Sequence, residues 1–358
     1  MKVLQLIDTL QAGGSERLAV NYANGLSKLG VESHLCTTRD EGSLLDAIDN
    51  AIGYLFLKRA STIDIKAILR LRRYVKSNNI DIIHAHSSSY FIASLVKVLI
   101  PRVKVVWHDH YGKSEMLDQR PKRVLSLCSS FFSYVFSVNK NLKEWSLKYL
   151  RSNNVEYIKN FPVLIEKKER LTILKGEDGK RLLCLANLRD QKNHLMLLEA
   201  FKRVNIEFSD WSLHCVGKDF KDEYSKTFFN KIEELNLQDN VHFYDSKSDV
   251  LNIISQCQIG LLSSKSEGLP LALLEYGLVK LPVIVTDVGD CKKLVSDNSL
   301  GQLVQSNDVE KFADSIKMFI SDEDYRLSCA KNFNKKVSKS YSEKRILSDI
   351  LEIYKSIL

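Results

Sequence analysis

Two carboxylates, Glu267 and Glu275, lie eight residues apart in residues 263–280, SSKSEGLPLALLEYGLVK. Glu275 stands among leucines that we expect to be half-buried, and because an unpaired buried charge is costly, it should have a polar partner. Backbone N–H groups around Gly268 and Leu269 are expected at a helix N-terminus, which attracts phosphate. An anion site with a carboxylate on either side suits a sugar joined to a nucleoside diphosphate.

The same segment carries the residue types that start a helix. Ser264 and Ser266 offer N-cap side chains, Gly268 allows a turn, and Pro270 suits the first helical turn, where the missing N–H costs nothing. We therefore expect a loop that opens directly into a helix.

Two cations follow an expected strand at residues 182–186. Arg189 and Lys192 lie in the loop NLRDQKN, residues 187–193. Beside a helix N-terminus, a guanidinium and an ammonium would neutralise a diphosphate and stabilise it as a leaving group. Solvated loop charges are an equally good interpretation of the loop by itself.

Gly13 and Gly14 follow the first expected strand and open a helix, so their amides could approach an anion or a sugar closely. A pair of glycines is also typical of a plain tight turn, and both interpretations stay open at this point.

Two H-x-H pairs stand at expected strand ends, and a spacing of two places each pair on one side of its strand. These histidines could be metal ligands, substrate-binding or catalytic groups, or hydrogen-bonded residues at a crowded strand end. No compact set of further ligands accompanies them, which favours a polar role over a metal. The pairs are His84 with His86 and His108 with His110.

Strand-like and helix-like patterns alternate along the whole chain, which predicts parallel sheets with crossover helices. In the first half we expect strands at 3–7, 32–37, 55–57, 81–85, 103–107, 131–139 and 155–159, and helices at 16–29, 63–77 and 90–99.

The charged, aperiodic stretch after Pro162 predicts a domain boundary, after which the pattern restarts. We expect two doubly wound α/β domains with a site in the cleft between them, beyond the carboxyl ends of the strands. The second half predicts strands at 182–186, 211–216, 241–244, 259–262 and 282–286. It predicts helices at 194–208, 225–235, 250–257, 309–320, 325–339 and 343–358, in addition to the helix that opens within 263–280.

The net charge of +8 is concentrated in the first half: residues 1–162 contain 23 Lys and Arg against 14 Asp and Glu, whereas 163–358 contain 29 against 30. A basic half suits an anionic membrane surface, nucleic acid or an anionic substrate. Residues 63–77 predict a basic amphipathic helix that either only packs on its sheet or also contacts a membrane. Seven cysteines without C-x-x-C spacing predict a reduced, cytoplasmic protein, and no apolar run reaches a spanning length.

In their order along the chain, these motifs resemble those of the family 4 retaining glycosyltransferases, which have the GT-B fold. Ser264, Glu267-Gly268 and Leu274-Glu275 match the family's S-x-x-E-G-x5-L-E segment. Residues 187–193 resemble the family's phosphate-binding loop, although Asn187 stands where many members have arginine. Residues 13–17 match its GG-x-E-R loop. Residues 81–86, D-I-I-H-A-H, resemble its D-I-V-H-A-H strand, and His110 falls where the histidine of its T-V-H motif stands.

The resemblance implies a role for each of these residues. Glu275 would bind the ribose, Glu267 would face the donor sugar, and Gly268 and Leu269, in the segment that begins with Ser264, would bind a phosphate. Arg189 and Lys192 would bind the diphosphate. His110 would lie near the transferred sugar, with Gly13 and Gly14 on the same side of the site.

The implied enzyme transfers a hexose or N-acetylhexosamine from a UDP- or GDP-sugar to a glycan or lipid-linked acceptor, in the synthesis of a bacterial surface polysaccharide. It retains the anomeric configuration, needs no metal or other cofactor, binds no nucleic acid, and works in the cytoplasm or at the inner face of an anionic membrane. Residues 1–162 would bind the acceptor, with 343–358 crossing back onto them, and 163–342 would bind the donor.

Two other function classes stay open at this point. A metal-dependent hydrolase would use the H-x-H pairs as ligands. A GT-B-shaped sugar-nucleotide epimerase, or a binding module without activity, would share the nucleotide-binding motifs but would not transfer a sugar.

Overall fold

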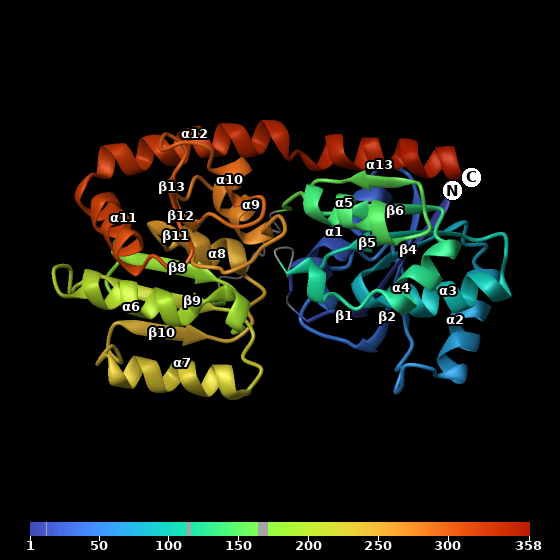
Figure 1. Cartoon of the computed structure of the whole chain (residues 1–358), viewed down its shortest axis with the longest axis horizontal. Coiled ribbons are helices and arrows are strands. Elements are labelled where there is room, and N and C mark those ends of the chain that lie inside the picture. The colour runs from blue at the N-terminus through green and yellow to red at the C-terminus, as the bar shows by residue number, and fades with distance from the viewer. Residues whose placement is uncertain (12, 113–115, 164–170) are drawn as a thin grey trace. The chain divides into compact units, whose positions relative to one another are not determined.

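The structure is a computed structural model that describes residues 1–11, 13–112, 116–163 and 171–358. The chain divides into two compact units, Met1–Phe161 with Glu343–Leu358 and Pro162–Ser342. Each unit contains a parallel β-sheet covered by helices (Figure 1). The expected class, two doubly wound α/β domains, is confirmed.

The sheet of the first unit has seven strands in the order β3-β2-β1-β4-β5-β6-β7. The order reverses direction between β1 and β4, as in doubly wound sheets. The strands are β1 (Lys2–Thr9), β2 (Glu32–Asp40), β3 (Gly53–Phe56), β4 (Ile82–His86), β5 (Lys104–Asp109), β6 (Tyr134–Ser137) and β7 (Val155–Tyr157); the helices are α1 (Gly14–Lys28), α2 (Ile65–Ser77), α3 (Tyr90–Leu99), α4 (Arg123–Cys128), α5 (Lys140–Tyr149) and α13 (Glu343–Ile357).

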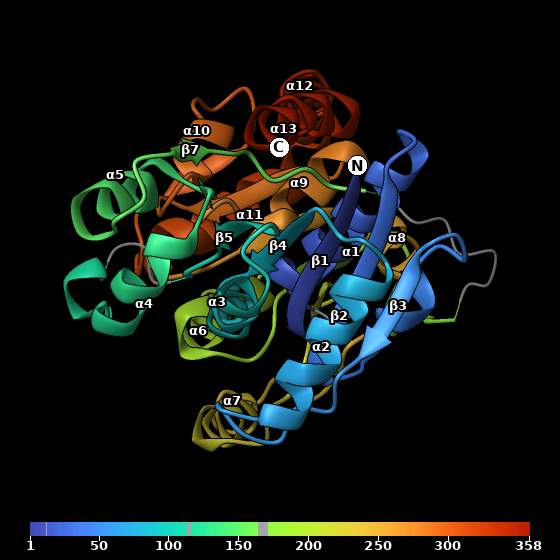
Figure 2. The same ribbon diagram turned by 90° about the vertical axis from the view of Figure 1, so that its right-hand side faces the viewer.

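One face of this sheet packs against α2, α3 and α4. Leu4 and Leu6 of β1 share a buried cluster with Ile68 and Leu71 of α2 and with Ile92 of α3. Helices α2 and α3 lie side by side over this face (Figure 2). The apolar face of the basic helix α2 is therefore buried, as its 3.6-residue periodicity predicts.

The opposite face of the sheet carries the alternate residues of each strand and packs against α1 and α13. Ile7 packs with Val20 of α1. From α13, Tyr354 reaches the buried His84 of β4, with 2.6 Å between its hydroxyl oxygen and His84 Nδ1. Gln5, between Leu4 and Leu6 in a strand of period two, consequently lies on this second face with the histidines.

The second unit has a six-stranded sheet in the order β10-β9-β8-β11-β12-β13. Helices α6, α7 and α11 contribute to the core on one face, and α8, α9, α10 and α12 contribute to the core on the other. The strands are β8 (Arg181–Leu185), β9 (Ser212–Val216), β10 (Val241–Tyr244), β11 (Ile259–Leu262), β12 (Val283–Thr286) and β13 (Gln302–Val304); the helices are α6 (His194–Asn205), α7 (Glu223–Glu234), α8 (Val250–Ser255), α9 (Leu271–Leu278), α10 (Cys291–Leu294), α11 (Val309–Ser321) and α12 (Glu323–Ser340).

The sequence did not predict α4, α5, α10 or β13. Helix α5 has a clear local start, because the Asn139 side chain accepts a hydrogen bond of 2.8 Å from the N–H of Leu142. The other three elements are only three to six residues long, which is too short to display a period. In the part of the chain that the structure describes, no helix combines the length and apolar character of a membrane span.

We expect Ile350→Ala in α13 to lower the free energy of unfolding of the first unit by about 2–4 kcal/mol, because Ile350 is fully buried and its loss leaves a cavity. Urea unfolding of the full-length protein measures this change. Glu352→Ala, on an exposed position of the same helix, is the control and should change stability by less than about 0.5 kcal/mol. Coincident unfolding curves for the two variants would show that α13 does not belong to the core.

Candidate functional site

The loops after β8 and β11 lie together because these two parallel strands are neighbours in the second sheet. The N–H of Lys265 donates to the carbonyl oxygen of Gln191 at 2.8 Å, and the Ser263 hydroxyl donates to the carbonyl oxygen of Lys192 at 2.9 Å. Two segments more than 70 residues apart in the sequence thus form one edge, at the carboxyl ends of neighbouring parallel strands.

Lys192 and Glu267 form a largely buried ion pair at this edge. Lys192 Nζ lies 2.6 Å from Glu267 Oε1, and the two side chains are 19 % and 6 % exposed. The Ser264 hydroxyl donates to the same carboxylate oxygen at 2.6 Å. A carboxylate with so little exposure needs polar partners, and the ammonium group of Lys192 and the hydroxyl of Ser264 are two of them.

Helix α9 begins later than the sequence predicts. It runs over Leu271–Leu278, and its N-cap is Pro270, which makes no capping hydrogen bond with its side chain. The expected capping by Ser264 and Ser266 is therefore wrong, since the chain first makes a loop and the Ser264 side chain is used to bind Glu267. The first-turn amides of α9 still lack intrahelical acceptors, as at every helix N-terminus.

Glu275 lies one turn inside α9 and is 5 % exposed. Leu273 and Leu274, which precede it, and Tyr276, which follows it, belong to the buried core of the second unit. The sequence correctly placed an acid in an apolar helix, and it is more deeply buried than the half-burial that we expected.

Arg189 and Lys192 have different partners and differ in exposure. Arg189 is exposed, and its guanidinium carbon lies 4.0 Å from the centre of the Phe220 ring, in a cation–π contact. Asn187, in the same loop, accepts a hydrogen bond of 2.8 Å from the N–H of Lys218 and so joins this loop to the one after β9. Phe220 falls in a loop where no sequence motif singles it out.

Gly289, after β12, is a residue of this edge that the sequence did not indicate. Its φ of 54° favours glycine, and a Cβ there would lie 2.0 Å from the carbonyl oxygen of Glu267. Next to it, the N–H of Asp290 donates to the carbonyl oxygen of Gly268 at 2.9 Å. The loop after β12 thus holds the backbone of Glu267 and Gly268, and the V-G-D sequence after a strand is the signal that could have identified it.

Gly13, Gly14 and His110 belong to the first unit, whereas the other predicted site residues belong to the second. Gly13 is the N-cap of α1 in an extended conformation, which does not require glycine. A Cβ at Gly14 would meet no atom within 4 Å among the described residues, so the space beside it is open to a ligand. The turn itself is ordinary, and only this free space supports a close approach by a ligand.

The four histidines stack on the face of the first sheet that carries α1 and α13. The ring centres of His84 and His86 lie 4.4 Å apart and those of His108 and His110 lie 4.1 Å apart, so each pair does share one side of its strand. His84, His86 and His108 are fully buried, and His110 is partly exposed. Burial lowers the pKa of His110 to about 3.

Ring nitrogens of His84, His86 and His108 lie within 4.8 Å of one another, which is a distance compatible with a metal. A ligand nitrogen needs a free lone pair, and a hydrolytic site needs an open position. Both nitrogens of His84 and of His86 already have hydrogen-bond partners, and only His108 Nε2 lacks one among the described residues. This arrangement does not favour the metal-dependent hydrolase.

His110 directly follows a rigid strand end. The two carboxylate oxygens of Asp109 accept hydrogen bonds of 2.7 and 2.8 Å from Arg120. The guanidinium carbon of Arg120 lies 4.4 Å from the centre of the Tyr111 ring and 4.2 Å from that of Trp145. A buried bidentate pair fixes backbone position well, so the place of His110 is determined by residues on both sides of it.

Two family models match the chain one after the other. A model described as Glycosyltransferase Family 4 matches residues 12–161, and one described as Glycosyl transferases group 1 matches residues 165–336. Together they cover most of both units.

Curated relatives and solved structures agree with these models. An uncharacterised glycosyltransferase of Haemophilus influenzae is 24 % identical over 354 residues, which are 97 % of this chain and 96 % of the relative. The UDP-Gal:alpha-D-GlcNAc-diphosphoundecaprenol alpha-1,3-galactosyltransferase of Escherichia coli is 24 % identical over 341 residues, 88 % of this chain and 87 % of the relative. The structure of the Anabaena protein HepE in complex with UDP-glucose superimposes with a TM-score of 0.82 at 17 % identity, covering 99 % of this chain and all of HepE. The chain belongs to the family 4 glycosyltransferases and has the GT-B fold.

Proposed function

We propose that this glycosyltransferase moves a hexose or N-acetylhexosamine from a UDP- or GDP-sugar to a glycan or lipid-linked acceptor in bacterial surface polysaccharide synthesis. The donor nucleotide sugar binds to the second unit, at the edge formed by the loops after β8, β11 and β12. The first unit binds the acceptor and supplies His110.

The Lys192–Glu267 pair is the observation that carries this proposal. Lys192 has one carboxylate partner at 2.6 Å, and an ammonium group has three N–H donors, so it can still bind phosphate oxygens beside the N-terminus of α9. Arg189, held against Phe220, adds a second cation for the diphosphate. Glu275 accepts hydrogen bonds from the ribose hydroxyls, and Glu267 faces the donor sugar.

Two relatives support the kind of substrate. The Escherichia coli relative is named for a UDP-galactose donor and a diphosphoundecaprenol-linked acceptor, and HepE was crystallised with UDP-glucose. Both donors are UDP-hexoses, so UDP is the first nucleotide to test. A thermal-shift screen with UDP, GDP and ADP identifies the nucleotide, because a ligand that binds the folded state raises the melting temperature.

We further propose that the enzyme retains the anomeric configuration and works without a metal. Cations of the protein, Arg189 and Lys192, would stabilise the leaving diphosphate in the place of a metal ion. The leaving phosphate would help to deprotonate the acceptor in a front-side displacement. Proton NMR of the product's anomeric centre tests retention, and transfer in the presence of EDTA tests metal independence.

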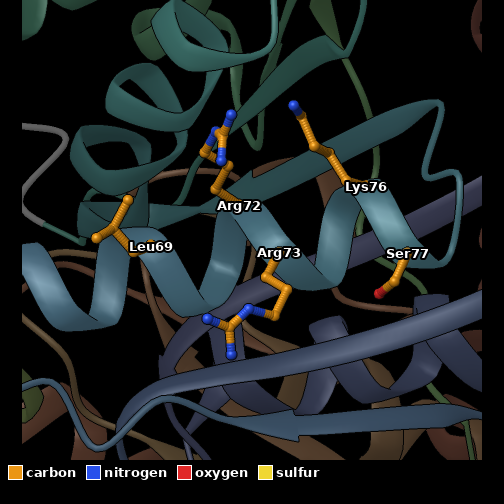
Figure 3. Close-up of a pocket in the computed structure, with 5 residues that line it drawn as sticks. All are labelled: Leu69, Arg72, Arg73, Lys76 and Ser77. Carbon is orange, nitrogen blue, oxygen red and sulfur yellow. The ribbon is translucent and has the colours of Figure 1, made fainter.

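A basic surface on α2 supports peripheral contact with the inner face of an anionic membrane. A surface pocket of about 410 Å³ lies along this helix. Among the residues that line it, Arg72 and Lys76 point to one side of the helix and Arg73 to the other (Figure 3). Ile65 and Leu69, on the same helix, are exposed apolar side chains. Basic groups beside exposed apolar ones suit the headgroup region of an anionic bilayer.

We expect Glu275→Ala to lower kcat/KM for the nucleotide sugar by roughly 100-fold, since it removes a charged acceptor for two ribose hydroxyls. Release of nucleoside diphosphate in the presence of acceptor measures the rate. Glu275→Gln, which keeps the size of the side chain, should lose nearly as much activity while melting close to the wild type. Unchanged transfer and donor hydrolysis in Glu275→Ala would refute the assignment of this residue.

Lys192→Ala and Lys265→Ala provide a matched pair, because each lysine lies 2.6 Å from a carboxylate on the same two loops. Lys265 and its partner Asp190 are exposed, and such a surface pair contributes little. We expect Lys192→Ala to lower kcat at least about 100-fold, because losses of this size follow the removal of one group that stabilises a leaving anion. Lys265→Ala should lower kcat less than about threefold. Equal losses in the two variants would mean that Lys192 has no special part in transfer.

We expect the double variant Arg72→Glu with Arg73→Glu to bind vesicles of phosphatidylglycerol and phosphatidylcholine at least about tenfold more weakly than the wild type, because each basic residue near an anionic surface contributes about 1 kcal/mol. Sedimentation with vesicles at low and high salt measures this binding. Lys331→Glu with Lys335→Glu on α12 makes the same change in net charge elsewhere and should bind like the wild type. Equal weakening by both double variants would assign the effect to net charge and not to α2.

A further inference from the structure

A line of hydrogen bonds crosses three neighbouring strands of the first sheet, from β1 through β4 to the end of β5. Gln5 Oε1 lies 2.8 Å from His86 Nε2, and His86 Nδ1 lies 3.0 Å from His110 Nε2. Gln5 and His86 are fully buried, whereas His110 is partly exposed. The line therefore begins in the core and ends at a side chain that a ligand can reach.

The direction of this line follows from the chemistry of its first member. A carbonyl oxygen only accepts hydrogen bonds, so His86 Nε2 must donate to Gln5 Oε1. A neutral imidazole has a single N–H, and His86 Nδ1 is therefore an acceptor. His110 Nε2 must then be the donor, which leaves the lone pair of His110 on Nδ1.

This reasoning needs both rings to be neutral. Burial lowers the pKa of His110 to about 3. Burial also holds the pKa of His86 well below its ordinary value, and the neighbouring His84 and His110 add to the effect. At neutral pH each ring consequently carries one proton, whose position is decided by its hydrogen-bond partners.

The direction of the line depends on which end of the Gln5 amide lies against His86. Gln5 Oε1 is the atom within hydrogen-bond distance of His86 Nε2, and Gln5 Nε2, at the other end of the amide, makes no hydrogen bond of normal geometry to the described residues. A reversed amide would reverse both histidine tautomers.

We propose that Gln5 and His86 are positioning residues that hold His110 as its Nε2–H tautomer, with Nδ1 as a hydrogen-bond acceptor for the substrate. The inference rests on the proposed role of His110 beside the transferred sugar. Among the described residues, Nδ1 of His110 has no recorded hydrogen bond, in contrast to Nε2. An acceptor there selects a ligand group that donates, such as a sugar hydroxyl or an amide N–H, and rejects a carboxylate or carbonyl oxygen.

The tautomers can be measured without any activity. Nitrogen-15 NMR of the full-length protein labelled at histidine distinguishes protonated from bare ring nitrogens, with His86 and His110 assigned by substitution of each in turn. We expect both rings to carry the proton on Nε2 in the wild type. A His110 signal with the proton on Nδ1 would overturn the proposal. If a variant fails to fold, assignment of the wild-type rings through their backbone resonances decides the same point.

Gln5→Met keeps the approximate volume of the side chain and removes the acceptor for His86. We expect the Nε2–H signal of His110 to give way to a mixture of tautomers, and kcat to fall about tenfold with donor KM within about twofold, because fewer molecules hold the competent form. Tyr22→Phe on α1 removes from the same buried cluster a hydroxyl that has no hydrogen-bond partner among the described residues, and it leaves the line from Gln5 to His110 intact. It should keep the wild-type His110 signal.

The outcomes separate this proposal from the proposed function. A His110 tautomer that does not change in Gln5→Met, or that changes equally in Tyr22→Phe, would refute the positioning role even if sugar transfer is observed. The wild-type protein could instead show the expected tautomers but release no nucleoside diphosphate. That result would leave the positioning role in place and refute the proposed transferase substrate.

Discussion

The ion pair between Lys192 and Glu267 is the interaction on which the edge of the second unit formed by the loops after β8, β11 and β12 depends. Glu267 is almost fully buried, and removing its partner would leave a desolvated charge that costs several kcal/mol. The pair also fixes geometry, since Lys192 follows β8 and Glu267 follows β11. Backbone hydrogen bonds beside the pair, from Lys265 to Gln191 and from Asp290 to Gly268, join three loops into one surface.

In the first unit, the face of the sheet that packs against α1 and α13 also holds buried polar side chains, but these are neutral. Four histidines, Gln5 and Tyr354 are packed where most domains have apolar side chains. Polar groups in such a place must hydrogen-bond one another, and burial keeps the imidazoles neutral so that they can donate and accept in turn. Helix α13 completes this layer from the far end of the chain, which makes the last residues part of the first unit.

Several features could be predicted because they are local in the sequence. A period of two marked the buried strands, a period of about 3.6 marked α2, and the spacing of Glu267 and Glu275 identified the segment that carries both acids. Short elements such as β13 and α10 could not be predicted, since three or four residues display no period. The serines before α9 were expected to cap it, because capping rules consider one helix end and not a competing carboxylate.

By itself, the sequence determined the alternation of strands and helices, the division near residue 162, and the residue types available at each strand end. Only the tertiary structure decided how those residues are used. It paired Lys192 with Glu267 across 75 positions, placed Arg189 against Phe220, brought Gly289 against the backbone of Glu267, and aligned Gln5, His86 and His110. The physical reason is that periodicity along a chain gives the face on which a side chain lies, whereas its partner depends on strand order and on the path of the loops.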